Sequence, residues 1–173
     1  MRRVQRRTAG IDVGEQAATR LGGPPALRPD AKEPKIPLTA DDKLEIMELV
    51  ARYNHAQDQD DYDGWVDTFT EDGVFESPQI RHQGREELRQ LSLDTAAGIP
   101  HVRHLTQNFL IEGDRDEATM KSTIQVMSIA EDRQSWRIVG IGNYEDDLVR
   151  GGGDWKFKRR FVRMLYWQND AWP

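Results

Sequence analysis

The hydrophobic pattern of the chain changes its period near Pro100, and this change constrains the fold more than any other feature of the sequence. Before Pro100, apolar residues recur at helical spacing, most clearly at Ile46, Leu49, Val50 and Tyr53. After it, apolar and polar residues alternate in four long segments, residues 102–112, 117–130, 135–149 and 154–167. Helices followed by long strands are typical of an α+β fold, in which helices gather on one face of an antiparallel sheet.

Three helices and one short strand are expected before Pro100. Thr39 and Asp42 can form a capping box, so the first helix should begin after Thr39 and run to about Gln57. A second helix, a short strand and a third helix are expected at residues 63–70, 74–77 and 85–93. The apolar residues of these helices would face the strands that follow.

The four long segments predict a curved, mainly antiparallel sheet, because turn residues that suit hairpins separate them. In the third segment, Trp136, Ile138, Gly140, Gly142 and Tyr144 should share one face. The two glycines can mark a bend or a bulge. A bent sheet with helices across its concave side leaves a conical cavity. The expected architecture is therefore a cone-shaped α+β barrel wrapped around N-terminal helices.

Composition excludes several classes of site and partner. The chain has no cysteine, so it forms no disulfide, zinc–thiolate site or cysteine nucleophile, which fits a cytoplasmic protein. A mean hydropathy of −0.77 argues against a membrane-spanning segment. Residues 1–36 carry a net charge of +4 and the whole chain −6, which leaves −10 on residues 37–173. An acidic body argues against a nucleic-acid partner, whose groove needs clustered positive charge.

The domain organisation follows from the distribution of proline and glycine. Residues 1–38 have linker composition, with Gly22-Gly23-Pro24-Pro25 and three further prolines, so they are expected to form a disordered or extended arm. The basic start of this arm lacks a following apolar run and is not a secretory signal. Residues 39–173 are expected to form a single domain.

Tyr53, Asp58 and His104 form the candidate catalytic set. Tyr53 and Asp58 lie five residues apart near the end of the first helix, and His104 lies in the first long strand. A phenol, a carboxylate and an imidazole supply a proton donor, an orienting anion and a general base, and this set needs no metal or cofactor. His104, Thr106 and Asn108 should share one sheet face, and a polar row on a buried face is costly unless it lines a cavity.

Each of these three residues also has a structural alternative. Tyr53 could be a core tyrosine, Asp58 could end the helix or accept a bond from a turn amide, and His104 could pack within the sheet. A single pocket would explain all three at once.

Six further residues are candidates for binding a ligand. Asn108 would line the same wall as His104. Arg160 could anchor an anionic or carbonyl group, or it could form an ion pair on the strand surface. The remaining four would form the cavity wall or the core: Trp65, Phe75, Met127 and Tyr144.

Six short motifs follow one another between residues 40 and 167. They are Arg52-Tyr53 with Asp58, Asp63-Gly64-Trp65, residues 69–75, His104 with Asn108, residues 142–146 and residues 155–160. In order and spacing the chain resembles the SnoaL-like branch of the nuclear transport factor 2-like superfamily, which has the α+β cone fold. The resemblance covers essentially the whole part that is expected to fold.

The resemblance also implies an activity. Scytalone dehydratase and bile-acid 7α-dehydratase are similar in site chemistry, and they eliminate water beside a carbonyl with a helix tyrosine, a nearby aspartate and a strand histidine. Tyr53, Asp58 and His104 would take those roles, without a cofactor, on an apolar polyketide-, steroid- or terpenoid-like compound. By the same resemblance the protein would be a homotrimer or homodimer, associating through the exposed sheet face.

Fold alone does not select the reaction, because the family also includes cyclases, isomerases, epoxide hydrolases and the non-catalytic small subunit of ring-hydroxylating dioxygenases. A cyclase or isomerase in the same pocket, or such a subunit, therefore remains an alternative to a dehydratase. The isomerase alternative is weakened because Glu76 stands near the strand position where ketosteroid isomerases carry an aspartate base.

Overall fold

A computed structural model describes residues 35–96 and 101–168. The chain divides into two units, residues 1–34 and 35–173, and the described residues all belong to the second. Apart from residues 35–38, the arm predicted over residues 1–38 lies outside the described residues. The end of that arm lies along the turn after Gly113, because Pro37 forms an antiparallel bridge with Asp114 and Lys35 Nζ lies 2.8 Å from an Asp114 carboxylate oxygen.

Helices come first and long strands follow, as the sequence predicts. The helices are α1 (Ala40–Asp58), α2 (Tyr62–Val66) and α3 (Arg85–Ala96). The strands are β1 (Phe69–Glu76), β2 (Arg81–Gln83), β3 (Val102–Gly113), β4 (Glu117–Ile129), β5 (Trp136–Gly151) and β6 (Asp154–Trp167). They form one sheet in the order β2-β1-β6-β5-β4-β3, in which only the β1–β6 pair is parallel.

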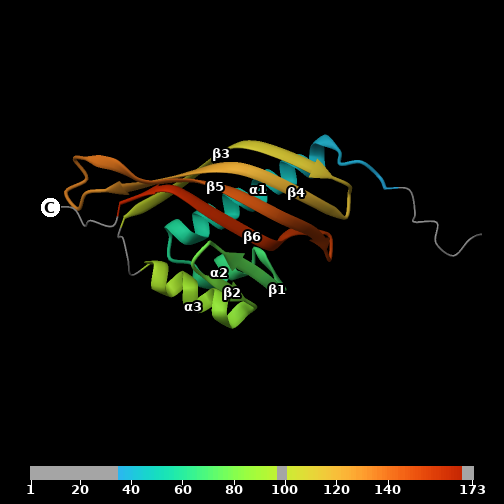
Figure 1. The fold of residues 1–173 in the computed structure, drawn as a ribbon, viewed down its shortest axis with the longest axis horizontal. Helices are drawn as coiled ribbons and strands as arrows, with labels where there is room; N and C mark the ends of the chain where they lie inside the picture. The colour runs from blue at the N-terminus through green and yellow to red at the C-terminus, as the bar shows by residue number, and fades with distance from the viewer. Residues whose placement is uncertain (1–34, 97–100, 169–173) are drawn as a thin grey trace, which may run out of the picture. The chain divides into compact units, whose positions relative to one another are not determined.

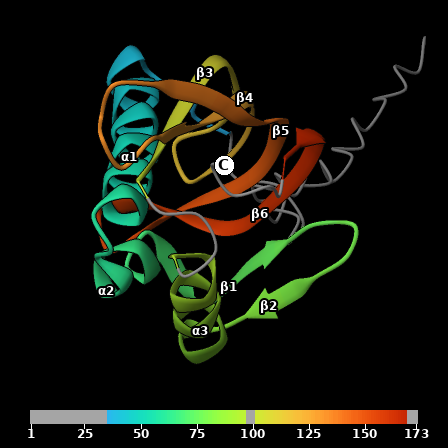
Figure 2. The same cartoon turned by 90° about the vertical axis from the view of Figure 1, so that its left-hand side faces the viewer.

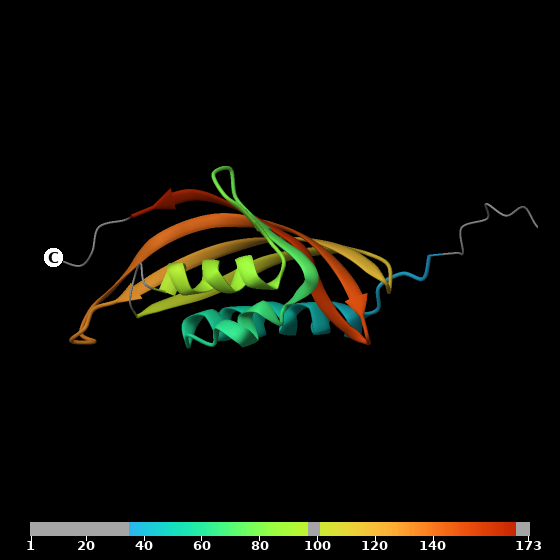
Figure 3. The ribbon, with the colours of Figure 1, turned by 90° about the horizontal axis from the view of Figure 1, so that it is seen from below.

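The described helices all lie on the concave side of this sheet, so the predicted α+β class and curved sheet are confirmed (Figure 1). Figure 2 shows how strands β3 to β6 curl, with α1 running along the side of β3. Seen from below, α1 and α3 both lie under the arch of the sheet (Figure 3). This arrangement places the end of α1 beside the start of β3, where two of the predicted catalytic residues lie.

Helix α1 begins as its sequence predicts. The Thr39 side chain accepts a bond from the Asp42 backbone N–H, and Asp42 accepts one from the Thr39 backbone N–H, which completes the capping box. The helix buries the predicted apolar face, and it packs against β3, α2 and β6. Tyr53 lies at the centre of these contacts, with the rings of Trp65 and Phe157 at centroid distances of 5.2 and 5.6 Å.

The second helix is shorter than predicted, and this part of the prediction is wrong. Helix α2 ends at Val66, and Phe69 opens strand β1 instead of continuing the helix. The reason is pairing with β6: the Phe157 backbone N–H donates to the Thr68 carbonyl at 2.9 Å, which pulls the chain into the sheet. Strand β1 consequently begins five residues before the predicted short strand at 74–77, and β2 has no counterpart in the prediction.

Three of the long strands contain bulges that turn their later residues to the other face. In β5 the bulge leaves Val139 opposite no partner, so Gly140 and Tyr144 face inward while Trp136 and Ile138 are exposed. The prediction that all five alternating residues share a face is therefore wrong. The expectation that the glycines mark a bulge is confirmed, because the register with β4 shifts next to Gly140 and the register with β6 shifts at Gly142.

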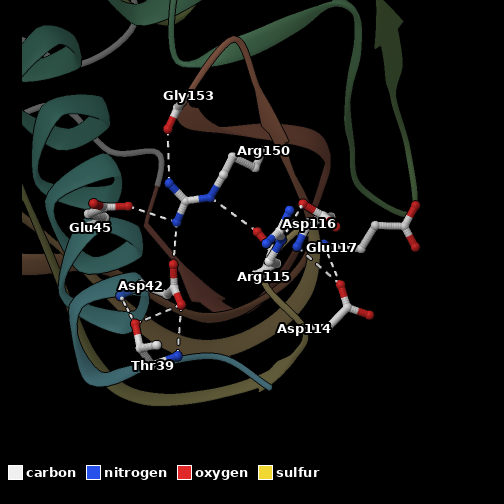
Figure 4. Close-up of polar contacts among 9 residues, drawn as sticks. All are labelled: Thr39, Asp42, Glu45, Asp114, Arg115, Asp116, Glu117, Arg150 and Gly153. Atoms are coloured by element: carbon white, nitrogen blue, oxygen red, sulfur yellow. Dashed lines mark hydrogen bonds and ion pairs between the residues drawn. The ribbon is translucent and has the colours of Figure 1, made fainter. Parts of the chain in front are cut away.

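An ion-pair network holds the end of the fold opposite the site (Figure 4). The Arg150 guanidinium donates to the Asp42 carboxylate and lies 2.9 Å from a Glu45 oxygen, which ties the first turns of α1 to the end of β5. The same guanidinium donates to the backbone carbonyls of Arg115 and Gly153. The start of α1 and two strand turns are thereby fixed together, which positions the far end of α1 against the sheet.

Candidate active site

A cavity of about 540 Å³ lies between the helices and the inner face of the sheet. No Lys, Arg, Asp or Glu among the described residues contributes to its wall. Apart from the indole N–H groups of Trp65 and Trp167, six lining side chains carry polar atoms: Tyr53, Gln57, Gln79, Thr95, His104 and Tyr144. The rest of the wall is apolar or aromatic and includes Trp65 and Phe75, as predicted, together with Trp167. Such a wall suits an uncharged, largely apolar molecule.

His104 and Asp58 form a hydrogen-bonded pair at one side of this cavity. The His104 Nδ1 lies 2.6 Å from Asp58 Oδ1, and the backbone N–H of His104 donates to both carboxylate oxygens at 3.2 and 3.1 Å. The two side chains are 12% and 8% exposed, respectively. Because an ionised carboxylate only accepts, Nδ1 carries the proton and the other nitrogen, Nε2, has the free lone pair in the neutral ring.

Tyr53 and Tyr144 bring two phenol groups to the same cavity. Burial raises the pKa of the Tyr53 hydroxyl above its ordinary value, while the positive charge of Arg160 opposes this shift. Burial raises the pKa of Tyr144 further, and the nearby Tyr53 adds to the effect. Both hydroxyls are therefore protonated at neutral pH, and they lie close enough to hydrogen-bond each other.

The predicted role of Arg160 in binding a ligand is contradicted, since its side chain is wholly buried and does not line the cavity. It donates from Nε and Nη2 to the Asp146 carboxylate at 2.8 and 2.9 Å, beneath the rings of Tyr53, Tyr144 and Phe157. Burial is the largest single effect and lowers its pKa, but the charge and hydrogen bonds of Asp146, together with Tyr53 and Tyr144, outweigh burial and raise the pKa above its ordinary value. The alternative of a surface ion pair is equally wrong, because this pair is buried.

Asn108 and Met127 do not line the cavity either, so these two predictions are also wrong. Asn108 has a φ of 59° at a bulge in β3, which turns its exposed side chain toward Thr123 and away from the face of His104. Met127 alternates with the buried residues Ile124 and Val126 on β4, so it lies on the outer face of the sheet. The inward row that begins with His104 continues only to Thr106, whose side chain bonds Asn54.

Several residues of the cavity wall were not predicted from the sequence, among them Gln57 and Trp167. Gln57 follows Tyr53 by four residues, so the helical period alone places both on one face of α1. Trp167 reaches the inner face only because a bulge at Leu165 shifts the end of β6 by one residue. The sequence therefore contained a signal for Gln57 and none for Trp167.

A comparison with known families gives one assignment. The family described as "SnoaL-like domain" matches residues 38–161 of the chain. The protein belongs to this SnoaL-like family. Its fold and the order of its motifs are those that the resemblance in the sequence implies.

Individual relatives support the same family. An uncharacterized protein from Mycobacterium tuberculosis is 30% identical over 122 residues, which cover 69% of this chain and 82% of the relative. A crystal structure from Nostoc punctiforme with a cystatin-like fold is 34% identical and covers 73% of this chain and 93% of that one, with a TM-score of 0.68.

A second solved structure shows the fold alone. It is a nuclear transport factor 2-like protein with a cystatin-like fold from Novosphingobium aromaticivorans, 21% identical, covering 72% of this SnoaL-like chain and 82% of the other, with a TM-score of 0.64. Within the described residues, no helix has the length and apolar character that crossing a membrane requires.

Proposed function

We propose that this SnoaL-like protein is a cofactor-independent dehydratase that removes water from a β-hydroxy carbonyl compound held in the cavity. The observation that carries the proposal is the orientation of His104. Its Nδ1 is bonded to Asp58, which leaves Nε2 as the basic nitrogen of a side chain in the cavity wall. A general base positioned in this way contributes about 10²–10⁴-fold to a rate.

In the proposed reaction, His104 Nε2 removes a proton from the carbon next to the substrate carbonyl. The electron pair of that C–H bond forms an enolate, which then expels the β-hydroxyl as a new carbon–carbon double bond forms. The proton on Nε2 passes to the departing oxygen, so that one water leaves and His104 returns to its neutral form. Asp58 holds the ring in the required tautomer and stabilises its cationic state.

Tyr53 is the proposed donor to the carbonyl oxygen. Its hydroxyl stays protonated because burial raises its pKa, and its ring is held by Trp65 and Phe157, so the donor is rigid. A hydrogen bond to this oxygen strengthens as negative charge develops on it, which stabilises the transition state more than the bound substrate. Tyr144, also in the cavity wall, lies close enough to hydrogen-bond the Tyr53 hydroxyl and would hold it in place.

The test is dehydration of a panel of aryl β-hydroxy ketones, followed by the absorbance of the conjugated product. We expect turnover by the wild type and its loss in His104→Ala, with Asp58→Asn nearly as damaged. Tyr53→Phe should lower kcat more than it raises KM, because its bond strengthens in the transition state.

The matched control is His82→Ala, which removes a histidine from β2, outside the cavity wall. This variant should keep full activity. Equal turnover by wild type and His104→Ala would overturn the proposal. An isomerised or cyclised product of unchanged mass would instead support the alternative reaction in the same pocket.

A further inference from the structure

Gln57 is a cavity residue that the proposed mechanism does not use. It follows Tyr53 by one helical turn on α1, so both side chains project from the same face. Gln57 is 8% exposed, and what remains exposed belongs to the cavity wall. A buried amide carries two N–H donors and one carbonyl acceptor, and each needs a partner.

Ser92 of α3 satisfies one end of this amide. Its hydroxyl, in a residue that is 1% exposed, donates to Gln57 Oε1 at 3.4 Å. The amide oxygen is thereby engaged on the α3 side, and the NH₂ group makes no hydrogen bond to residues 35–96 or 101–168. This NH₂ group is not among the fully buried polar atoms that lack a partner, so it is accessible from the cavity. A ligand held in the cavity can therefore supply its acceptor.

The Tyr53 hydroxyl is a second donor on this side of the wall. It is protonated because burial raises its pKa, and it lies one helical turn from Gln57 on the same face of α1. With the Gln57 NH₂ group, this side of the cavity therefore presents donors in excess of acceptors. The complementary ligand carries an acceptor oxygen there.

The charge of the wall decides which kind of oxygen this is. A carboxylate or phosphate would need a cation, and no Lys or Arg of the described chain lines the cavity. The nearest buried cation, Arg160, is already neutralised by Asp146. An uncharged carbonyl oxygen meets both conditions, since it accepts two hydrogen bonds and brings no net charge.

We propose that Gln57 is a substrate-binding residue that donates to the carbonyl oxygen of an uncharged ketone, and that Ser92 is its positioning residue. The inference rests on the proposed function, because it assigns Gln57 to the same carbonyl oxygen as Tyr53. It narrows the substrate class to neutral ketones and excludes carboxylic acids.

Calorimetric binding of three matched probes tests the proposal: methyl naphthyl ketone, naphthoate and ethylnaphthalene. The wild type should bind the ketone best and the anion worst. Gln57→Leu should weaken ketone binding about tenfold, as the loss of one neutral hydrogen bond predicts, and leave ethylnaphthalene unchanged. The infrared carbonyl stretch of the bound ketone should lie at lower frequency in the wild type than in Gln57→Leu.

Further variants keep the test decisive. Gln57→Glu preserves the shape of the side chain and removes its N–H donors, so it should also lose ketone affinity. Ser92→Ala should weaken ketone binding in the wild-type background and have no further effect in Gln57→Leu. Gln59→Leu changes a neighbouring glutamine outside the cavity wall and should bind as the wild type does.

Two results would overturn the inference: equal ketone affinity in wild type and Gln57→Leu, or an equal loss for ketone and ethylnaphthalene. Naphthol serves as a fourth probe, because its hydroxyl donates a hydrogen bond. If Gln57→Leu weakens only the binding of naphthol, the amide presents its oxygen and the inference is overturned. The ketone probe has no hydroxyl to eliminate, so these outcomes do not depend on dehydration. Failure of all three probes to bind would instead count against the proposed function and its cavity.

Discussion

Two pairs of a basic side chain with a carboxylate lie on the concave side of the sheet, and they differ in what they leave unpaired. In the Arg160–Asp146 pair both side chains are 0% exposed, and two hydrogen bonds join them within β5 and β6. In the His104–Asp58 pair the side chains are 12% and 8% exposed, and the pair joins β3 to the end of α1. His104 lines the cavity, whereas Arg160 is sealed beneath aromatic rings.

This difference shows which of the two pairs can act on a ligand. Asp146 uses both carboxylate oxygens on Arg160, so that pair holds two strands and the packed rings together. Asp58 instead fixes one nitrogen of His104 and leaves the other available in the cavity. The sequence pattern does not distinguish the two pairs, because each consists of a basic residue on a strand and an acidic residue. Burial and the direction of the remaining free atoms distinguish them.

Removing Asp146 should produce the largest loss of stability. Asp146→Ala leaves the Arg160 charge buried without a partner, and breaking a buried pair in this way costs about 3–5 kcal/mol. Urea unfolding of wild type and variant measures the difference. A cost below about 1 kcal/mol would show that water or another group compensates Arg160, and the contrast between the two pairs would fail.

Replacing both members of the buried pair should cost less than replacing Asp146 alone. Asp146→Leu combined with Arg160→Met removes both charges and fills the space with apolar atoms, a change that is often neutral for a buried pair. The same urea experiment should therefore place the double variant nearer to the wild type than Asp146→Ala. A double variant less stable than Asp146→Ala would mean that packing on Tyr53 and Tyr144, not charge, dominates.

Removing the His104 side chain should have a much smaller effect on stability. In His104→Ala the backbone N–H of residue 104 still donates to the Asp58 carboxylate, so this charge keeps part of its hydrogen bonding. We expect a cost of about 1 kcal/mol, that of a single lost hydrogen bond. If unfolding shows a loss as large as that of Asp146→Ala, the pair is structural.

The smallest effect is expected for an ion pair at the surface, between Lys35 and Asp114. Hydrogen bonding to Lys35 and to two backbone N–H groups lowers the pKa of Asp114 to about 2. A lowered pKa stabilises the fold above the ordinary value of 3.8, and this contribution is lost as pH falls through about 2. Asp114→Asn should lower Tm by less than about 4 °C at pH 7, and it should leave Tm unchanged once the pH has fallen below about 2. An equal loss at both values would contradict this account.

Much of this arrangement was predictable from local patterns. The capping box at Thr39 sets the start of α1, and five residues separate Tyr53 from Asp58 at its end. The first strand after Pro100 then has to return along this helix, which brings His104 to Asp58. These predictions depend on the helical period of α1 and on the alternation at the start of β3, and neither segment contains a bulge that would disturb its pattern.

Errors arise where the sheet bends. The inward residues Trp155 and Phe157 put Arg160 on the outer face by simple alternation, but a bulge at Lys158 turns it inward. A bulge turns Asn108 outward in the same way. A bulge relieves the strain that curvature puts on a sheet. Because the packing of the whole sheet determines this curvature, no local sequence pattern predicts where a bulge lies. A single inserted residue is therefore enough to turn a predicted ligand-binding residue into a core residue, as at Arg160, or to turn it out to the surface, as at Asn108.

The most direct test of the central claim measures proton removal itself, without knowledge of the natural substrate. Methyl naphthyl ketone in deuterium oxide exchanges the protons next to its carbonyl, and proton NMR follows the rate. The wild type should accelerate this exchange, and His104→Ala should reduce the protein-catalysed rate about 10²–10⁴-fold while His82→Ala leaves it unchanged. Exchange by His104→Ala at the wild-type rate would show that His104 is not the base and would contradict the account.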